Sequence, residues 1–139
     1  MDNPNLPKLV AVPPKWRERY GKGTMLVPSP REVDDLIRKV PRGRLTTVSQ
    51  LRDSLANTHG ANVTCPLTTG IFVWLAAQAA EEAAREGKHR ITPYWRVVKD
   101  DGSLNPKFPG GVRHQAELLE AEGHRIAPGK GNRPPHVAV

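Results

Sequence analysis

The sequence predicts a mainly α-helical fold with a small β-hairpin, built around a helix-turn-helix of the winged-helix-like kind. Three observations support this fold class. Capping boxes, in which Ser or Thr is followed three residues later by Glu or Gln, begin at Ser29 and Thr47. Apolar residues follow the first box at helical spacing. Residues 91–98 are typical of an extended segment and precede an Asp-Asp-Gly turn at 100–102.

Length and composition are those of one globular domain. The chain has 139 residues, of which 37% are hydrophobic and 25% charged, and a chain of this length buries roughly two-thirds of its unfolded surface. No apolar run approaches the ~20 residues of a membrane span, and no signal peptide opens the chain. The single cysteine, Cys65, excludes an internal disulfide. We therefore expect a cytoplasmic protein without a membrane span.

Positive charge gathers at the two ends of the chain. Residues 1–28 hold five Lys or Arg against two acids, and residues 123–139 hold three against none, whereas residues 29–122 hold thirteen against twelve. This predicts a basic, proline-rich arm over 1–28, a nearly neutral domain over 29–126 and a basic, mobile tail over 127–139. Basic arms bind phosphates without selecting a sequence. Solvated tails that only improve solubility are the alternative.

The helices are expected in order along the domain. The first begins after Ser29, and a Pro-Arg-Gly break at 41–43 ends it. The second follows Thr47, and a turn separates it from a longer helix that Thr64 or Cys65 can cap. A short helix, a turn and a longer helix form a helix-turn-helix candidate. The expected helices cover 30–40, 47–56, 66–86 and 111–122.

The longest expected helix divides into two faces. A helical wheel places large residues on one face, which we expect to be the core, and small uncharged residues on the other. The large set is Leu67, Ile71, Trp74, Leu75 and Gln78, and the small set is Thr69, Val73, Ala76 and Ala80. Small residues on an outer face allow close approach to a narrow groove, or they indicate a helix packed on both sides.

The C-terminal part is expected to contain the hairpin and the last helix. The extended segment 91–98 turns at 100–102, and a Pro/Gly loop covers 105–111. The last helix ends at Gly123, because glycine favours the end of a helix. Its inner face carries Val112, Ala116 and Leu119.

Three motifs resemble the methylated-DNA–protein cysteine methyltransferases. The segment 93–98 reads Pro-Tyr-Trp-Arg-Val-Val where that family reads Pro-Cys-His-Arg-Val-Val. Gly110-Gly111 and the run at 118–125 are similar to the family's closing helix, and 42–48 is similar to its entry into the helix-turn-helix. The resemblance covers residues 30–126 and implies the alkyltransferase C-terminal domain, which binds DNA.

The resemblance also implies a lost reaction. The family flips an alkylated guanine out of DNA and transfers the alkyl group to a cysteine, which a histidine and a carboxylate activate. Tyr94 stands at the cysteine's position, Trp95 at the histidine's, and Glu122 matches the carboxylate. Neither Tyr94 nor Trp95 can form a thiolate or relay its proton. We therefore expect a catalytically inactive protein without a cofactor, as in the alkyltransferase-like proteins, which also lack the cysteine and bind alkylated DNA.

Two departures from the family concern DNA binding. Val48 stands where the family has a tyrosine that helps to rotate the target phosphate. No arginine lies in 53–84, where the family has one near Thr68 or Thr69. An apolar or cationic wedge offsets the cost of unstacking a flipped base, and Phe72 is one candidate for it.

We expect the protein to be a monomer that binds duplex DNA in the minor groove. A link to DNA repair is expected, with repair proteins as further partners. The residues expected to contact DNA are Arg42, Arg44, Thr46, Thr47, Ser49, Thr68 and Thr69. The alternatives are a protein-interaction module that uses the face 69–80, and residual activity through Cys65, which we expect to be structural. No metal-ligand spacing relates the five histidines to Cys65, so no metal site is expected.

The large aromatics at the former active site have two interpretations. Tyr94 and Trp95 can stack on a base, or they fill the space of a vanished pocket, which we favour because aromatics are core builders first. Arg96 is expected to hold loop carbonyls or a neighbouring carboxylate rather than DNA. Glu122 is expected to be an ordinary helix-end residue or a partner of Arg96. Trp16 is expected to pin the N-terminal arm onto the domain.

Overall fold

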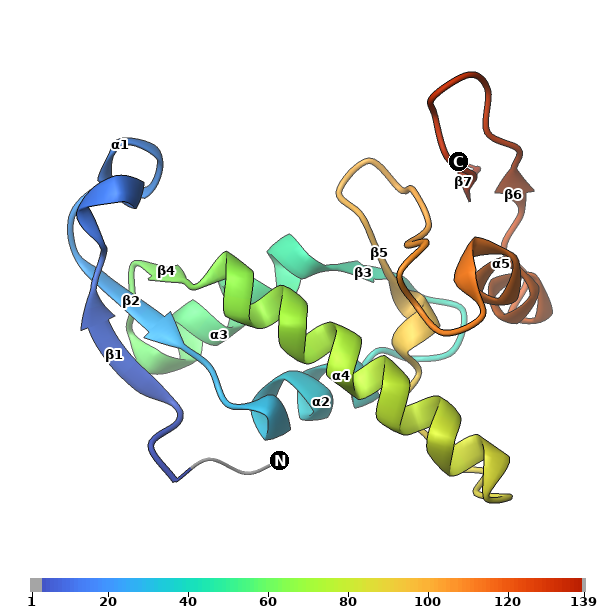
Figure 1. Ribbon diagram of the computed structural model, residues 1–139, viewed down its shortest axis with the longest axis horizontal. Helices are drawn as coiled ribbons and strands as arrows, with labels where there is room; N and C mark the ends of the chain where they lie inside the picture. The colour runs from blue at the N-terminus through green and yellow to red at the C-terminus, as the bar shows by residue number, and fades with distance from the viewer. Residues whose placement is uncertain (1–3, 139) are drawn as a thin grey trace.

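The computed structural model describes residues 4–138, and these are mainly helical (Figure 1). The helices are α1 (Arg17–Tyr20), α2 (Pro30–Arg38), α3 (Val48–His59), α4 (Pro66–Arg85) and α5 (Gly111–Ala121), with 3-10 turns η1 (Pro14–Trp16) and η2 (Tyr94–Arg96). The strands are β1 (Lys8–Ala11), β2 (Thr24–Val27), β3 (Thr46–Thr47), β4 (Val63–Thr64), β5 (Val97–Val98), β6 (Ile126–Ala127) and β7 (His136–Val137). The predicted fold class is confirmed.

Both predicted capping boxes form. The Ser29 hydroxyl accepts from the backbone N–H of Glu32 at 3.2 Å, and the Glu32 carboxylate accepts from the backbone N–H of Ser29 at 3.1 Å. Thr47 and Gln50 make the same reciprocal pair at the start of α3. This helix runs beyond the predicted end and stops at Gly60, whose φ of 66° is a left-handed conformation that suits glycine.

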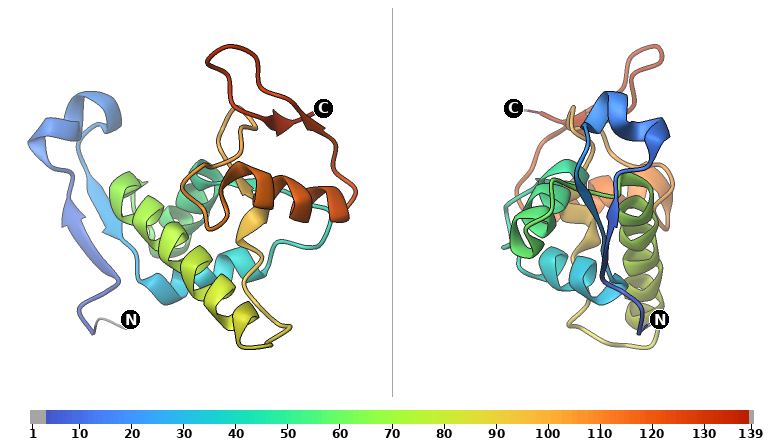
Figure 2. Two further views of the ribbon diagram at one scale, coloured as in Figure 1. Left: turned by 45° about the vertical axis from the view of Figure 1, so that its right-hand side comes forward. Right: turned by 90° about the vertical axis from the view of Figure 1, so that its left-hand side faces the viewer.

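The helical core forms where α2, α3 and α4 pack together, and η2 closes it (Figure 2). The buried side chains of this core include Val33, Ile37, Leu51, Leu55, Val73, Ala77 and Tyr94. Within the part of the chain that is described, no helix has the length and apolar character needed to cross a membrane.

The face of α4 that enters this core is opposite to the expected one. The buried residues are Thr69, Val73, Ala76, Ala77 and Ala80. The exposed large residues are Leu67 at 64%, Ile71 at 48% and Trp74 at 42%. The prediction was wrong because α2 and α3 both pack against α4, and helices approach closely only where the side chains between them are small.

Most of the N-terminal segment belongs to the folded domain. β1 and β2 form an antiparallel pair, and β2 continues in parallel with β4. Val12, Met25 and Cys65 form a small core of their own, against which Trp16 packs. Trp16 therefore pins this segment to the domain, as predicted. The predicted boundary at residue 29 does not separate two structural units, because the sheet crosses it.

The C-terminal strands pair differently from the predicted hairpin. The turn at 100–102 forms, and the Gly102 N–H donates to the Lys99 carbonyl at 2.8 Å. However, β5 pairs in parallel with β3, and the antiparallel pairs are β1–β2 and β6–β7. The predicted mobile tail folds back onto the domain through β7, where the Leu104 N–H donates to the Pro135 carbonyl at 3.0 Å.

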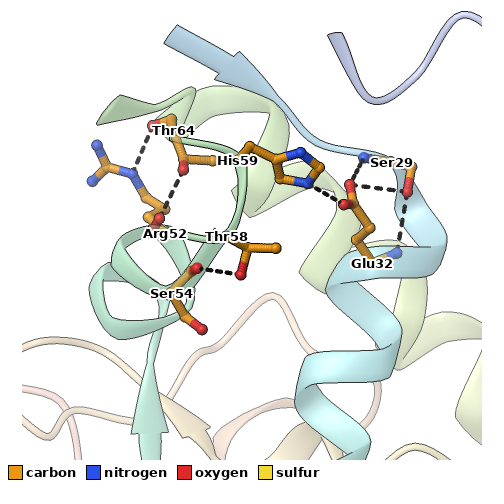
Figure 3. A network of polar contacts seen from close by, with 7 residues as sticks. All are labelled: Ser29, Glu32, Arg52, Ser54, Thr58, His59 and Thr64. Carbon is orange, nitrogen blue, oxygen red and sulfur yellow. Dashed lines mark hydrogen bonds and ion pairs between the residues drawn. The ribbon is translucent and has the colours of Figure 1, made fainter. Parts of the chain in front are cut away.

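Polar contacts join α2, α3 and β4 at one end of the helical core (Figure 3). One oxygen of Glu32 contacts Nε2 of His59 at the end of α3, while the other serves the capping box of α2. The Arg52 guanidinium donates to the Thr64 carbonyl at 3.0 Å, and the Thr64 hydroxyl donates to the Arg52 carbonyl at 2.7 Å. These contacts fix α3 against α2 and against β4, the strand that leads into α4.

Candidate functional site

Tyr94 lies in the interior of the domain. η2 places its ring beside α4 with an exposed fraction of 0%, in edge contact with Trp95 and Phe108 at centroid distances of 5.4 and 5.2 Å. Its hydroxyl donates to Oε2 of Glu81. Burial, and then the hydrogen bond and charge of Glu81, raise the pKa of Tyr94. Tyr94 is therefore a core residue, and that it fills the space of the family's pocket stays a prediction.

Arg96 and Glu122 form a buried ion pair beside Trp95. Their side chains are 13% and 4% exposed, and the guanidinium donates from Nη2 at 2.7 Å and from Nε at 3.0 Å. The Trp95 indole N–H donates to the same carboxylate at 3.0 Å. Burial opposes the charge of Glu122, but the donors on Arg96 and Trp95 outweigh it and lower the pKa of Glu122. Of the two roles expected for Glu122, the structure shows the partner of Arg96, and Arg96 also donates to the Val40 carbonyl at 2.6 Å.

Two polar residues that sequence reasoning missed hold this segment in place. The amide of Gln115, which is fully buried, donates to the carbonyls of Trp95 and Val97 at 3.1 Å each. Glu81, which accepts from the buried tyrosine, also contacts Nε2 of His114 at 3.0 Å. The available signal for Gln115 was a polar residue on the inner face of α5. Glu81 gave no signal, because its partners are 13 and 33 residues away.

Two of the predicted DNA contacts are buried. Thr69 is 0% exposed, and its hydroxyl donates to the Cys65 carbonyl at 2.7 Å. Thr46 is 9% exposed, and its hydroxyl donates to Oε1 of Gln50 at 3.2 Å. The prediction that Thr46 and Thr69 contact DNA is wrong. Thr46 is covered by its pairing with β5, and Thr69 is buried on the inner face of α4.

The other predicted contacts are partly or fully accessible: Arg42, Arg44, Thr47, Ser49 and Thr68. Ser49 donates to Asp100 at 2.8 Å near the start of α3. The two arginines lie in the loop between α2 and β3, where Arg42 donates to the last carbonyl of α5, that of Ala121, at 3.0 Å. Solvent still reaches these side chains, so their role at DNA stays a prediction.

The exposed face of α4 borders a groove that the sequence did not predict. The groove has a volume of about 640 Å³, and Leu67, Ile71 and Trp74 line it from the helix. The opposite wall is the loop before α5, to which the Trp74 indole N–H donates at the Lys107 carbonyl, at 3.0 Å. Phe72, the residue proposed as a wedge, instead packs against the helical core.

Positive charge gathers on the same side of the molecule as this groove. Figures 1 and 2 show α1, the loop after β5 and the loop between β6 and β7 projecting toward one side, with α1 and the loop between β6 and β7 at opposite ends of the long axis. The segment around α1 carries Lys15, Arg17, Arg19 and Lys22, and the loop between β6 and β7 carries Lys130 and Arg133. This side therefore combines an apolar groove with lysines and arginines at both of its ends.

Cys65 is placed for a structural role. The residue is 5% exposed, and its sulfur caps α4 by accepting from the Thr68 N–H at 3.5 Å. Among residues 4–138, no three His, Cys, Asp or Glu side chains lie together in a way that could hold a metal ion.

The fold and motifs described above define a helix-turn-helix domain with a partly exposed second helix. The family model described as 6-O-methylguanine DNA methyltransferase, DNA binding domain, matches residues 28–124. The chain belongs to this family. The crystal structure of S. pombe Atl1 in complex with damaged DNA containing O6-carboxymethylguanine is similar, with a TM-score of 0.50, 19% identity, and coverage of 78% of this chain and 87% of that chain. The comparison with curated proteins gave no match.

Proposed function

We propose that the protein binds duplex DNA and transfers no alkyl group. The observation that carries the proposal is a DNA-binding domain of this family with a buried tyrosine, Tyr94, at the motif position of the acceptor cysteine. A phenol with a raised pKa, hydrogen-bonded to a carboxylate, is a poor nucleophile. The indole of Trp95 donates a hydrogen bond but cannot accept a proton, so it cannot replace a histidine.

The proposed contact surface is the side of the molecule that carries α1, the groove and the loop between β6 and β7. Its lysines and arginines suit phosphates, and the proposed region of DNA is the minor groove. Atl1, which shares the fold, was crystallised with damaged DNA, and this supports a damaged duplex as the ligand class. One chain is the proposed binding unit, and repair proteins are proposed to join the DNA complex.

A salt-dependent binding assay tests the DNA contact. A gel shift at ~50 mM salt should give a complex at micromolar protein. Replacing Lys15 and Arg19 by alanine should weaken binding and reduce the slope of log affinity against log salt by about 2. The matched control, Arg85→Ala with Lys88→Ala, removes two charges at the other end of α4 and should leave the slope unchanged. The absence of any complex would contradict the proposal.

The absence of transfer is tested separately. After incubation with an oligonucleotide that contains O6-methylguanine, the intact mass of the protein should be unchanged. A gain of one methyl group, at Cys65 or elsewhere, would overturn the non-catalytic half of the proposal and leave the DNA-binding half standing.

A further inference from the structure

Another hollow lies on the side of the domain away from the groove beside Trp74. This hollow, which we call the basic cleft, has a volume of about 320 Å³. It is lined by Arg38 at the end of α2, by residues 89–91 after α4, and by Pro93, Trp95 and Arg96 at η2. Figures 1 and 2 show the segment after α4 on the far side of the domain from the loop after β5.

The second half of α4 separates the basic cleft from the proposed DNA-contact side. Trp74 lines the groove on that side, and the cleft begins at His89, beyond the last helical residue, Arg85. Arg85 follows Trp74 by eleven residues, which span roughly 17 Å of helix. The cleft is therefore a surface of its own, which another molecule can occupy while DNA is bound.

The charge of the cleft favours an anionic ligand. Its lining includes arginines and a histidine but no carboxylate within residues 4–138. Arg38 is bound to Asp34 only through Nε, at 2.8 Å, so its Nη groups stay available. The Glu122 carboxylate that neutralises Arg96 is 4% exposed and does not face solvent. Arg90 is exposed and makes no ion pair or hydrogen bond to any described residue, so its charge is unmatched.

The floor of the cleft is apolar. Ile91 and Trp95 are partly buried and pack against the helical core, and Pro93 is buried between them in the chain. The Trp95 indole N–H is taken up by Glu122, and the Arg96 guanidinium lies 5.7 Å from the centre of the indole ring. The ring therefore offers the cleft apolar surface without a free donor. Such a floor suits an apolar side chain better than a bare phosphate.

The backbone at the rim of the cleft is available to a peptide. The N–H and carbonyl groups of His89, Arg90 and Ile91 make no hydrogen bond within the described chain. Pro93 disfavours a helical conformation at Thr92, so α4 cannot continue through this segment and satisfy those groups. Free main-chain donors and acceptors beside a side-chain pocket are what an extended peptide uses when it binds along a segment.

We propose that the basic cleft binds an acidic segment of a partner protein, in which an apolar side chain lies next to the carboxylates. The carboxylates would meet Arg90 and the Nη groups of Arg38, and the apolar side chain would cover Ile91 and Trp95. The inference goes beyond the proposed DNA binding and does not depend on it. It gives one chain two separate surfaces, one for a duplex and one for a protein.

Fluorescence anisotropy with a labelled peptide tests the cleft. The probe is a short peptide with one leucine between pairs of glutamates, and the full-length protein should bind it at micromolar concentration. Replacing the leucine by serine, or the glutamates by glutamine, should each weaken binding roughly ten-fold. These changes leave the protein untouched, so a folding defect cannot explain the loss.

Matched charge reversals locate the peptide on the protein. Arg90→Glu should weaken peptide binding about ten-fold, since it sets a like charge against the glutamates, and should leave the affinity for duplex DNA nearly unchanged. Lys15→Glu is the control, because it makes the same charge change at α1, outside the cleft. It should leave peptide binding unchanged. Thermal unfolding checks that both variants are folded, and saturating duplex DNA should not displace the peptide.

The outcomes separate this inference from the proposed function. If the peptide does not bind, or if Arg90→Glu binds it as tightly as the wild type, the inference is overturned. Displacement by duplex DNA would place the peptide on the DNA-contact side, and displacement by micromolar inorganic phosphate would make the cleft a phosphate site; either result overturns it. A protein that binds the peptide but no duplex loses the proposed function and keeps this inference.

Discussion

At the scale of single residues, the buried ion pair between Arg96 and Glu122 is the contact whose loss should cost the most stability. The side chains of Arg96 and Glu122 are almost completely buried, and Arg96, Trp95 and the backbone of Gly43 all donate hydrogen bonds to the carboxylate. Such a pair adds little stability compared with apolar residues, but removal of one partner leaves an uncompensated charge in the interior. The pair therefore connects η2 to the end of α5, and both elements depend on it.

Glu122→Gln should lower the free energy of unfolding by about 3 kcal/mol at pH 7, because the Arg96 charge then stays buried without its partner. The folded-state pKa of Glu122 is lowered, so its contribution is present above its unfolded-state pKa of about 4.3 and is lost as the pH falls through the folded-state value. Urea denaturation should therefore give a difference between wild type and variant that shrinks as the pH falls below 4.

Glu117→Gln is the control for that experiment. Its carboxylate is 63% exposed and lies 3.7 Å from the Arg113 guanidinium, and exposed pairs of this kind contribute little. This variant should unfold like the wild type at every pH. A Glu122→Gln difference that stays constant from pH 7 to pH 3 would contradict the role of the charged carboxylate.

Single residues were predictable where one motif named them. The pairing of Arg96 with Glu122 was one of two alternatives that the motif suggested, and the burial of Tyr94 was expected from the size of an aromatic ring. Glu81 and Gln115 were not predictable, because their partners come from other elements and a hydrogen bond across the fold leaves no local pattern. The sequence therefore identified the residues of the motif but not the contacts that hold it.

At the scale of elements, local signals were reliable and the orientation of α4 was not. Both capping boxes marked the first turn of a helix, because a capping box is a contact over three residues. A helical wheel divides a helix into two faces, but it does not determine which face is buried. In α4 the small face is inside, since two other helices pack against it.

The buried face of α4 gives a prediction about stability. Ala77 is 0% exposed in the helical core, so Ala77→Leu should force neighbouring side chains apart and lower the free energy of unfolding by about 1–3 kcal/mol. Leu67→Ser, on the exposed face, should change it by less than about 0.5 kcal/mol. Chemical denaturation of the two variants measures both. A larger loss of stability in Leu67→Ser than in Ala77→Leu would instead support the helical-wheel prediction, in which the large residues face the core.

At the scale of the whole molecule, amino-acid composition did not predict that the two ends of the chain are folded. Proline and lysine suggested a free arm and a tail, yet β1 and β2 join a sheet with β4, and β7 returns to pair with β6. Pairing between β2 and β4 joins residues almost forty positions apart. Such long-range pairing depends on the whole chain, so short windows of sequence did not indicate it.

Removal of residues 1–22 tests whether the N-terminal segment is structural. This deletion takes away Val12 and Trp16, which pack in the same small core as Cys65. Cys65, which is 5% exposed in the full chain, should then react with a thiol reagent at least about ten-fold faster, because local opening governs access to a buried group. An unchanged rate would mean that this segment does not cover the cysteine.

The carboxylate of Glu32 links two helix ends that are far apart in the chain. One of its oxygens holds the first turn of α2, and the other contacts His59 in the last turn of α3. If either helix end frays and displaces Glu32, the other end loses a hydrogen-bond partner. Without this carboxylate, the first turn of α2 and the last turn of α3 could unfold independently. Because both turns depend on Glu32, we expect them to open together.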